Sequence, residues 1–389
     1  MQPDLARWLV SDDARAALRA AAAEADPESL GAATRLRALV EPDRAAAVLT
    51  QVALRRRARA KFGERAEGLF FTRDGLEQAT RASVAARRAR RFAALGAAVV
   101  ADLGCGLGAD ALALIDAGIA AEAVERDEAT AVLAAANLGR PVAVADAQAW
   151  WAERTASGPD AAGLGVFADP ARRTASGRSW RVEDLSPPWP FVESLLSGGH
   201  PACVKLGPGV PHDLLEDAVE AEWVSEGGSV VECAVWAGPG TVAGRRAAVV
   251  DGVELVASGR PPAEVGPVGA FVYEPDGAVV RAGLVDEVAG LVRGHRVAPG
   301  LAYLSADWVM PTPFATCFAV RDVLAFDEKV LRAWVRAEGV GVLEIKKRGV
   351  DVDPAALRRR LKPKGAASAT LILTPTPDGA VAIVADRVR

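Results

Sequence analysis

The stretch VVADLGCGLGAD, residues 99–110, contains an apolar run, an acid and three glycines separated by single residues. The apolar run predicts a buried strand, and the sequence ADALALIDAG, which begins after the last glycine, predicts a helix. Glycines between a strand and a helix let the backbone approach a ligand closely, and the helix N-terminus offers unpaired N–H groups. The spacing also fits the dinucleotide pattern GxGxxA, with Ala109 in the last place, so the glycines alone leave a dinucleotide site open.

Acidic residues stand at or near the ends of three successive apolar runs, which are predicted strand ends. Asp102, two residues before Gly104, can face the amino group of a bound amino acid, whereas it would repel a pyrophosphate. Glu125, at the end of AEAVE, is placed to accept hydrogen bonds from both ribose hydroxyls, and we prefer it to Asp127 because it lies nearer the apolar run. Asp146, which ends PVAVAD, can accept a hydrogen bond from an adenine amino group.

These positions favour S-adenosylmethionine as the cofactor. Its expected binding residues are Asp102, Gly104, Cys105, Gly106, Glu125, Asp146 and the neighbouring Ala147. The alternative for any one acid is that it ends a strand only because acids favour turns and solvent. Cys105 is expected to be merely a small residue of the loop, because no adjacent His or second Cys could activate its thiol.

Four regions with different sequence character follow one another along the chain. Residues 1–92 are rich in Ala, Leu and Arg and predict an N-terminal helical domain. Residues 93–250 alternate short apolar runs with helical stretches, which predicts a parallel α/β sheet that binds the cofactor. Residues 251–300 form a connecting region where Gly and Pro cluster, and residues 301–389 predict helix, strand, helix, strand and strand in a small α+β domain.

Composition sets limits on the class of protein. The 389 residues are 51% hydrophobic and 25% charged, with a formal net charge of -4, which is ordinary for a globular protein. No uncharged apolar stretch approaches the roughly 20 residues of a membrane span, and acids stand where a signal peptide would be basic, so we expect a cytoplasmic protein without membrane contact. The four cysteines form no CxxC pair and only three histidines occur, so we expect neither a metal site nor a disulfide framework.

Basic residues are concentrated in two regions of this acidic chain. Residues 55–91 contain 12 Lys/Arg against 4 Asp/Glu, and residues 339–365 contain 8 against 3. The sequences KKRG and RRRLKPK in the second region suit phosphate groups, although a solvated basic helix face is the alternative. The candidate RNA contacts are Lys346, Lys347, Arg348, Arg358 and Arg359.

The run from DLGCGLGAD through VERD, VADA and FADPAR resembles class I S-adenosylmethionine-dependent methyltransferases across about residues 65–250. Within that class, FFTRDGLEQAT, DPARR, KLGPGVPH, AEWVSEGGSVVE and the last hundred residues are similar to an actinobacterial and Bacteroidetes group with a C-terminal THUMP-like domain. The resemblance implies a Rossmann-like seven-stranded sheet, an N-terminal helical domain and a C-terminal α+β THUMP-like domain. It also implies RNA as the partner, and a segment before the first strand that folds over the cofactor, where Thr72 and Gln78 would touch it.

The sequence VFADPARR, residues 166–173, ends the fourth predicted strand. In class I amino-methyltransferases a motif (Asp/Asn/Ser)-Pro-Pro-aromatic accepts a hydrogen bond from the target amino group and stacks on a flipped base. Asp169 and Pro170 match its first half, whereas Ala171 and Arg172 depart from it. Arg172 can instead stack its guanidinium on a base or contact a phosphate, so Asp169, Pro170 and Arg172 are the candidate catalytic residues. A proline turn with solvated arginines is the alternative.

The favoured function is methylation of a base in tRNA or rRNA, with the guanine exocyclic amino group preferred, by a monomeric enzyme. Three alternatives stay open: a noncatalytic RNA-binding or assembly factor that retains the cofactor pocket, a small-molecule methyltransferase and, least favoured, a nicotinamide dehydrogenase. Lys205 can face substrate or extend to solvent, and His212 can begin a helix or act in the site. The tryptophans near the fourth strand, among them Trp151 and Trp180, are expected to be packing residues.

Overall fold

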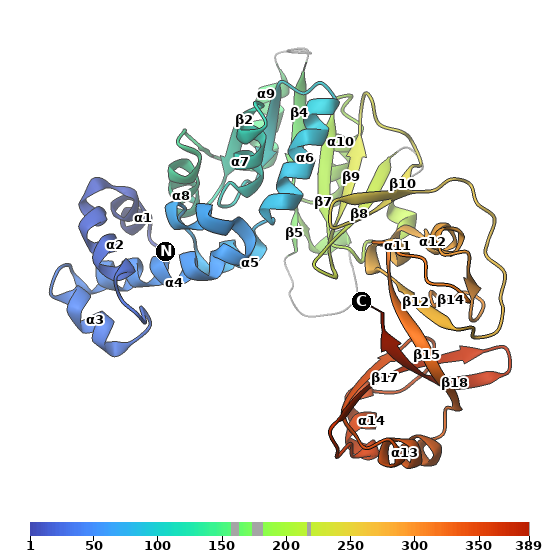
Figure 1. The fold of residues 1–389 in the computed structure, drawn as a ribbon. Coiled ribbons are helices and arrows are strands. Elements are labelled where there is room, and N and C mark those ends of the chain that lie inside the picture. The colour runs from blue at the N-terminus through green and yellow to red at the C-terminus, as the bar shows by residue number, and fades with distance from the viewer. Residues whose placement is uncertain (157–162, 173–181, 216–218, 389) are drawn as a thin grey trace. The chain divides into compact units, whose positions relative to one another are not determined.

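The computed structural model describes residues 1–156, 163–172, 182–215 and 219–388, apart from the side chain of Arg172 (Figure 1). These residues form two compact units. The first contains Met1–Glu220 and Ala234–Gly244, and the second contains Ala221–Cys233 and Arg245–Arg389. Arg173 and Trp180 lie outside the described residues. In the described part of the chain, no helix has both the length and the apolar character needed to cross a membrane.

The first unit begins with a helical region, as the alanine-rich sequence predicts. Its elements are α1 (Pro3–Val10), η1 (Asp12–Ala14), α2 (Arg15–Ala22), α3 (Leu30–Arg37), α4 (Pro42–Phe62), η2 (Gly63–Gly68), α5 (Arg73–Gln78) and α6 (Ala82–Ala94). The longest helix, α4, starts with Pro42 in its first turn and stops at Gly63, whose φ of 59° favours glycine. Its buried residues include Val48, Gln51 and Val52. This helix therefore belongs to the core of the first unit.

A largely parallel sheet follows in the first unit, with strands in the order β9-β7-β4-β1-β2-β3, of which β9 contributes its last residues, Ala234–Ala237. The strands are β1 (Val99–Leu103), β2 (Ala120–Glu125), β3 (Ala143–Val144), β4 (Leu164–Ala168), β7 (Ala202–Leu206) and β9 (Ser229–Ala237). β1 pairs in parallel with both β2 and β4, and β4 pairs in parallel with β7. The connecting helices are α7 (Ala109–Asp116), α8 (Glu128–Leu138), α9 (Ala147–Ala156) and α10 (Trp189–Leu196).

The order in which strands are added to this sheet reverses after β3. β2 and β3 lie on one side of β1, and β4 and β7 lie on the other side. Ligands of parallel α/β sheets bind at the carboxyl ends of the strands beside such a switch point. Asp102, Glu125 and Asp169 all stand at this edge. Short β5 (Ala171–Arg172) pairs with β6 (Leu185–Ser186) just beyond it, and η3 (Val182–Asp184) and η4 (His212–Leu214) are single turns.

The second unit contains two stretches of sheet. β8 (Glu220–Glu226), β10 (Arg246–Val250) and β11 (Val253–Val256) follow the order β11-β10-β8. A separate seven-stranded sheet has the order β13-β14-β12-β15-β18-β17-β16. Its strands are β12 (Phe271–Pro275), β13 (His295–Arg296), β14 (Leu304–Ala306), β15 (Ala315–Ala325), β16 (Val340–Lys347), β17 (Ala367–Thr376) and β18 (Gly379–Arg387).

The last part of the chain has the predicted order of elements. Helix α13 (Glu328–Ala337), β16, α14 (Pro354–Leu361), β17 and β18 follow one another, preceded by the long strand β15. Both helices pack on one face of the sheet, where Leu331, Leu357 and Leu371 share a buried cluster. Helices α11 (Gly277–Ala282) and α12 (Val285–Leu291) complete the unit. The mixed α/β fold with a helical N-terminal region and a second C-terminal sheet confirms the predicted fold class.

Candidate active site

A cavity of about 610 Å³ lies in the first unit at the carboxyl ends of its strands. Nine of the residues predicted from the sequence line it: Gln78, Asp102, Gly104, Cys105, Gly106, Glu125, Asp146, Ala147 and Asp169. Three predicted residues lie differently. Thr72 caps α5 by accepting a hydrogen bond from the Gly75 N–H at 3.0 Å, and Pro170 is buried beside the cavity edge. Arg172 belongs to β5, and its side chain is outside the described residues.

Asp102 is the most deeply buried acid of the cavity wall, with 1% of its surface exposed. Its Oδ2 atom has no hydrogen-bond partner among the described residues. Burial raises the pKa of Asp102 well above its usual value, the negative charge of Asp110 adds to the rise, and the Arg88 guanidinium opposes it. A buried carboxylate oxygen without a donor fits a ligand that carries an ammonium group, as S-adenosylmethionine does in its amino acid part.

The glycine loop leaves room beside this acid. Gly104 and Gly106 have φ values of 85° and 55°, where a side chain is disfavoured, and a Cβ at either position would meet no protein atom within 4 Å. The space that these side chains would have filled is therefore available to a ligand. The thiol of Cys105 has a pKa raised well above its ordinary value by burial and by the acids Asp102 and Glu125, so the thiol is held protonated and is a poor nucleophile.

The next two acids are oriented by backbone N–H groups. Glu125 accepts from the N–H of Gly106 at 3.1 Å and from the N–H of Asp127 at 2.9 Å. Asp146 caps α9 by accepting from the N–H groups of Gln148 at 2.9 Å and Ala149 at 3.1 Å. Both carboxylates therefore hold fixed orientations at the cavity wall, and each oxygen retains a further lone pair for a ligand hydroxyl or amino group.

Asp169 is held by a side chain from the neighbouring strand. The Lys205 ammonium, near the end of β7, forms an ion pair with Asp169 Oδ2 and lies 3.4 Å from the hydroxyl of Thr80. Thr80 in turn donates to Asp110 at 2.7 Å, and Asp110 forms a buried ion pair with Arg88. Lys205 thus faces the site, with 15% of its side chain exposed, and joins Asp169 to a buried polar chain.

Sequence reasoning missed Thr80, Asp110 and the buried ion pair of Arg88. The only local signal was the position of Asp110 in the first turn of α7, where an acid is favourable. His212 begins η4, which agrees with its alternative as a helix-start residue. Trp151 is buried in a core cluster with Leu164. Among the described residues, no group of three or more His, Cys, Asp or Glu could hold a metal ion.

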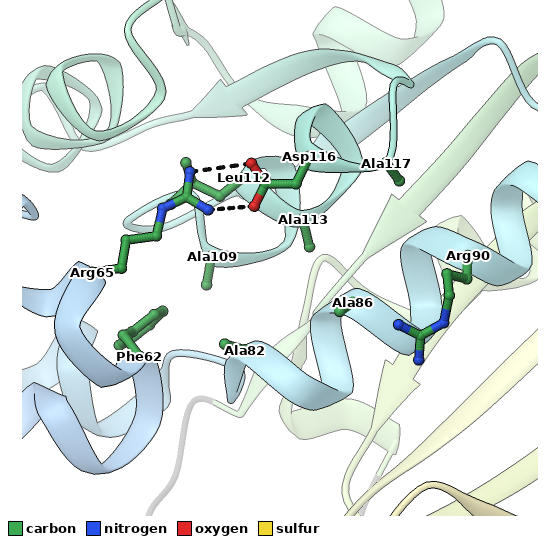
Figure 2. Close-up of a pocket in the computed structure, with 10 residues that line it drawn as sticks. All are labelled: Phe62, Arg65, Ala82, Ala86, Arg90, Ala109, Leu112, Ala113, Asp116 and Ala117. Atoms are coloured by element: carbon green, nitrogen blue, oxygen red, sulfur yellow. Dashed lines mark hydrogen bonds and ion pairs between the residues drawn. The ribbon is translucent and has the colours of Figure 1, made fainter.

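A second cavity of about 220 Å³ lies between α6, α7 and the end of α4 (Figure 2). Its walls consist largely of alanines, with Phe62 and Leu112, and Figure 2 shows the Arg65–Asp116 ion pair on one side and Arg90 on the other. None of the residues predicted to bind cofactor or acceptor lines it. Ala109, the first residue of α7, lines both cavities.

The five predicted RNA contacts in the second unit have different surroundings. Lys346 is half-buried between the acids Glu274, at 2.8 Å, and Glu344, at 3.5 Å. Arg348 lies over the Tyr303 ring, 5.5 Å from its centre. The other three, Lys347, Arg358 and Arg359, are exposed. Among the described residues Lys346 is the one member of the set in an ion pair, and the three exposed cations can reach a phosphate without leaving a buried contact.

Comparisons with known proteins give the family. Two family models match parts of the chain: "THUMP domain-like" over residues 315–387, and "Domain of unknown function (DUF8688)" over residues 2–58. The uncharacterized S-adenosylmethionine-dependent methyltransferases MT3122 and Rv3037c, from two strains of Mycobacterium tuberculosis, are each 34% identical to this chain over 354 residues. The match covers 88% of this chain and 96% of each relative.

A solved structure shares the fold. The crystal structure of a protein from Porphyromonas gingivalis W83, assigned as a methyltransferase, has a TM-score of 0.76 and 23% identity, and the match covers 97% of this chain and 99% of that one. This structural similarity includes residues of both units. Membership of the family is shown by the two Mycobacterium tuberculosis relatives. The cofactor is thus S-adenosylmethionine rather than a dinucleotide, and the chain belongs to the S-adenosylmethionine-dependent methyltransferases that carry a THUMP-like domain at the C-terminal end.

Proposed function

We propose that this methyltransferase transfers its methyl group to an amino nitrogen of a base in tRNA or rRNA, with the guanine exocyclic amino group as the preferred acceptor. The observation that carries the proposal is the position of Asp169. Its carboxylate lines the cofactor cavity directly after β4 and is held there by Lys205. A carboxylate at this point can accept a hydrogen bond from an amino group that enters the cavity.

The bound cofactor supplies a methyl group on a positively charged sulfur, and methyl transfer needs little from the protein beyond an acceptor held in line with that group. Asp169 accepts one N–H of the acceptor, which orients the nitrogen lone pair toward the methyl group. The new N–C bond would replace the S–C bond of the cofactor, and Asp169 can accept the proton that the nitrogen then releases. Lys205 holds the Asp169 carboxylate in place by direct pairing.

The cofactor is expected to lie along the wall formed by the other acids. Asp102 provides the buried oxygen for the ammonium group, and Glu125 and Asp146 provide acceptors for the ribose and the adenine. Pro187 and Pro188 also line the cavity and offer apolar surface against which a base ring can lie. They can take the place of the aromatic residue that Ala171 and Arg172 do not supply.

RNA is proposed as the substrate for two reasons. Residues 315–387 match the THUMP-like model, and THUMP domains present RNA to attached modification enzymes. Lys347, Arg358 and Arg359 add exposed cations in the same part of the chain. Contacts of this kind to phosphates give binding that weakens as salt rises, by roughly one ion released per neutralised phosphate.

The test is transfer of labelled methyl from S-adenosylmethionine to total RNA of a strain that lacks the gene, followed by mass spectrometry of the nucleosides. We expect label in one methylated nucleoside, which is absent from the deletion strain. Asp169→Ala should abolish transfer and leave the Kd for the cofactor within about threefold. Full activity of Asp169→Ala would show that the assigned role is wrong, and labelling of a small molecule instead of RNA would identify the other acceptor class.

A further inference from the structure

We propose that helix α4 is a scaffold that holds one wall of the cofactor cavity, and that this is a function of the N-terminal helical region. The wall is residues 69–80, here called the wall segment. Asp74, Gly75, Gln78, Ala79 and Thr80, all in this segment, line the cavity. The inference concerns cofactor binding and does not depend on which acceptor is methylated.

Three side chains of α4 bind the backbone of the wall segment. The Gln51 amide donates to the Phe71 carbonyl at 2.5 Å and accepts from the Phe71 N–H at 2.9 Å. Arg55 Nε donates to the Leu69 carbonyl at 2.8 Å. Gln51, Arg55 and Lys61 lie within roughly 120° of one another around the helix axis, so α4 presents them to the segment together.

Lys61 makes the most extensive of these contacts. Its ammonium donates to the carbonyls of Leu76 at 2.7 Å, Glu77 at 2.7 Å and Ala79 at 2.9 Å. These three bonds use all its donors, and they satisfy carbonyls at the C-terminal end of α5, where a cation is favourable. A helix of six residues has little stability of its own, so α5 depends on such outside contacts.

The far side of the wall segment is joined to the glycine loop. The Asn137 amide, on α8, accepts from the Phe70 N–H at 2.7 Å and donates to the carbonyls of Phe70 and Leu107, each at 3.0 Å. The approach is close enough that a Cβ on Gly75 would lie 2.7 Å from the Leu107 side chain. The wall segment therefore connects α4 to the loop that contacts the cofactor, and loosening α4's contacts should open the cavity.

Helix α4 offers a matched control. Arg56, one residue after Arg55, also donates to backbone carbonyls, those of Ala25 at 2.8 Å and Glu24 at 2.5 Å, which lie outside the wall segment. Lys61→Met and Arg56→Met each remove one cation and its carbonyl contacts from the same helix. Only the first should affect the cavity. Lys61→Arg retains the charge and part of the contacts and should restore binding in part.

The experiment measures the Kd for S-adenosylhomocysteine by calorimetry and the hydrogen exchange of residues 69–80. We expect Lys61→Met to raise the Kd about tenfold and to speed exchange in the wall segment, with Arg56→Met within twofold of the unmodified protein in both. Equal Kd values for Lys61→Met and the unmodified protein, or equal losses in both variants, would overturn the proposal. If Lys61→Met melts below the assay temperature, Arg55→Met repeats the measurement with Gln51 and Lys61 in place. Because no acceptor is present, the outcome is independent of whether RNA is the substrate.

Discussion

The two cavities of the first unit differ in what their walls leave unsatisfied. The larger one contains a buried carboxylate oxygen without a donor, two positive-φ glycines and several acids at strand ends. The smaller one is lined mainly by alanines; its charges Arg65 and Asp116 pair with each other, and its third charged residue, Arg90, is exposed to solvent. Both are hollow, and α7 begins between them at Ala109. The comparison indicates that buried polar atoms without a hydrogen-bond partner identify a ligand site better than cavity volume does, because a bound ligand can provide the missing partner.

The largest expected effect on cofactor affinity comes from replacing Asp102, whose buried oxygen has no hydrogen-bond partner among the described residues. Asp102→Asn should weaken binding of S-adenosylhomocysteine by roughly 10- to 100-fold, because a hydrogen bond to a charged group contributes about 1.5–3 kcal/mol. The same change should raise the melting temperature of the cofactor-free protein, since it removes a buried acid with a raised pKa. Calorimetry and thermal melting measure the two effects. Unchanged affinity would show that Asp102 does not meet the ammonium group.

A smaller effect is expected on the acceptor side of the same cavity. Lys205→Met removes the ion-pair partner that holds Asp169 in position, so methyl transfer at pH 7 should fall about tenfold. Lys205→Arg should recover much of the rate. Cofactor affinity should stay within threefold, which distinguishes a fault in acceptor positioning from a general loss of the cavity. Loss of cofactor binding in Lys205→Met would contradict the assignment of Lys205 to the acceptor side of the cavity.

The effect of pH follows from the raised pKa of Asp102. Between the unfolded pKa, near 3.8, and the higher folded pKa, the native protein binds more protons than the unfolded chain, so this group's contribution to stability is lost as pH rises. Cofactor binding needs the ionised form and changes in the opposite direction. Affinity should therefore increase with pH, by up to about tenfold per unit below the folded pKa, and level off above it. Melting shifts with S-adenosylhomocysteine at several pH values measure this dependence, and Asp102→Asn should flatten it.

The smallest effect is expected in the alanine-lined cavity. Ala86→Leu fills part of it with a good helix-forming residue, so stability should change by no more than about 1 kcal/mol and cofactor affinity by less than twofold. Denaturant unfolding and calorimetry measure both. A tenfold change in affinity would show that the two cavities are coupled through α7, and the contrast between them would then fail.

The sequence predicted the elements whose signals are local. The glycine loop, the acids at three strand ends and Asp169 needed only short apolar runs and the residues that follow them. Contacts between distant residues left no such signal: Lys205 meets Asp169 from 36 positions away, and Asn137 meets Phe70 from 67. Glu274, the nearer of the two acids paired with Lys346, lies far upstream in a different strand, so a cation counted as available for RNA is already paired. Long-range pairing is set by packing of the whole unit.

Thr80 has a consequence for the order in which ligands bind. Its hydroxyl accepts from Lys205, the partner of Asp169, and donates to Asp110, whose charge contributes to the raised pKa of Asp102. One hydroxyl therefore connects the acceptor side of the cavity with the cofactor side. By thermodynamic linkage, a cofactor that stabilises the ionised form of Asp102 and a base that hydrogen-bonds Asp169 each change the affinity for the other by the same factor. We therefore expect that a ligand in one half of the cavity changes the affinity for a ligand in the other half.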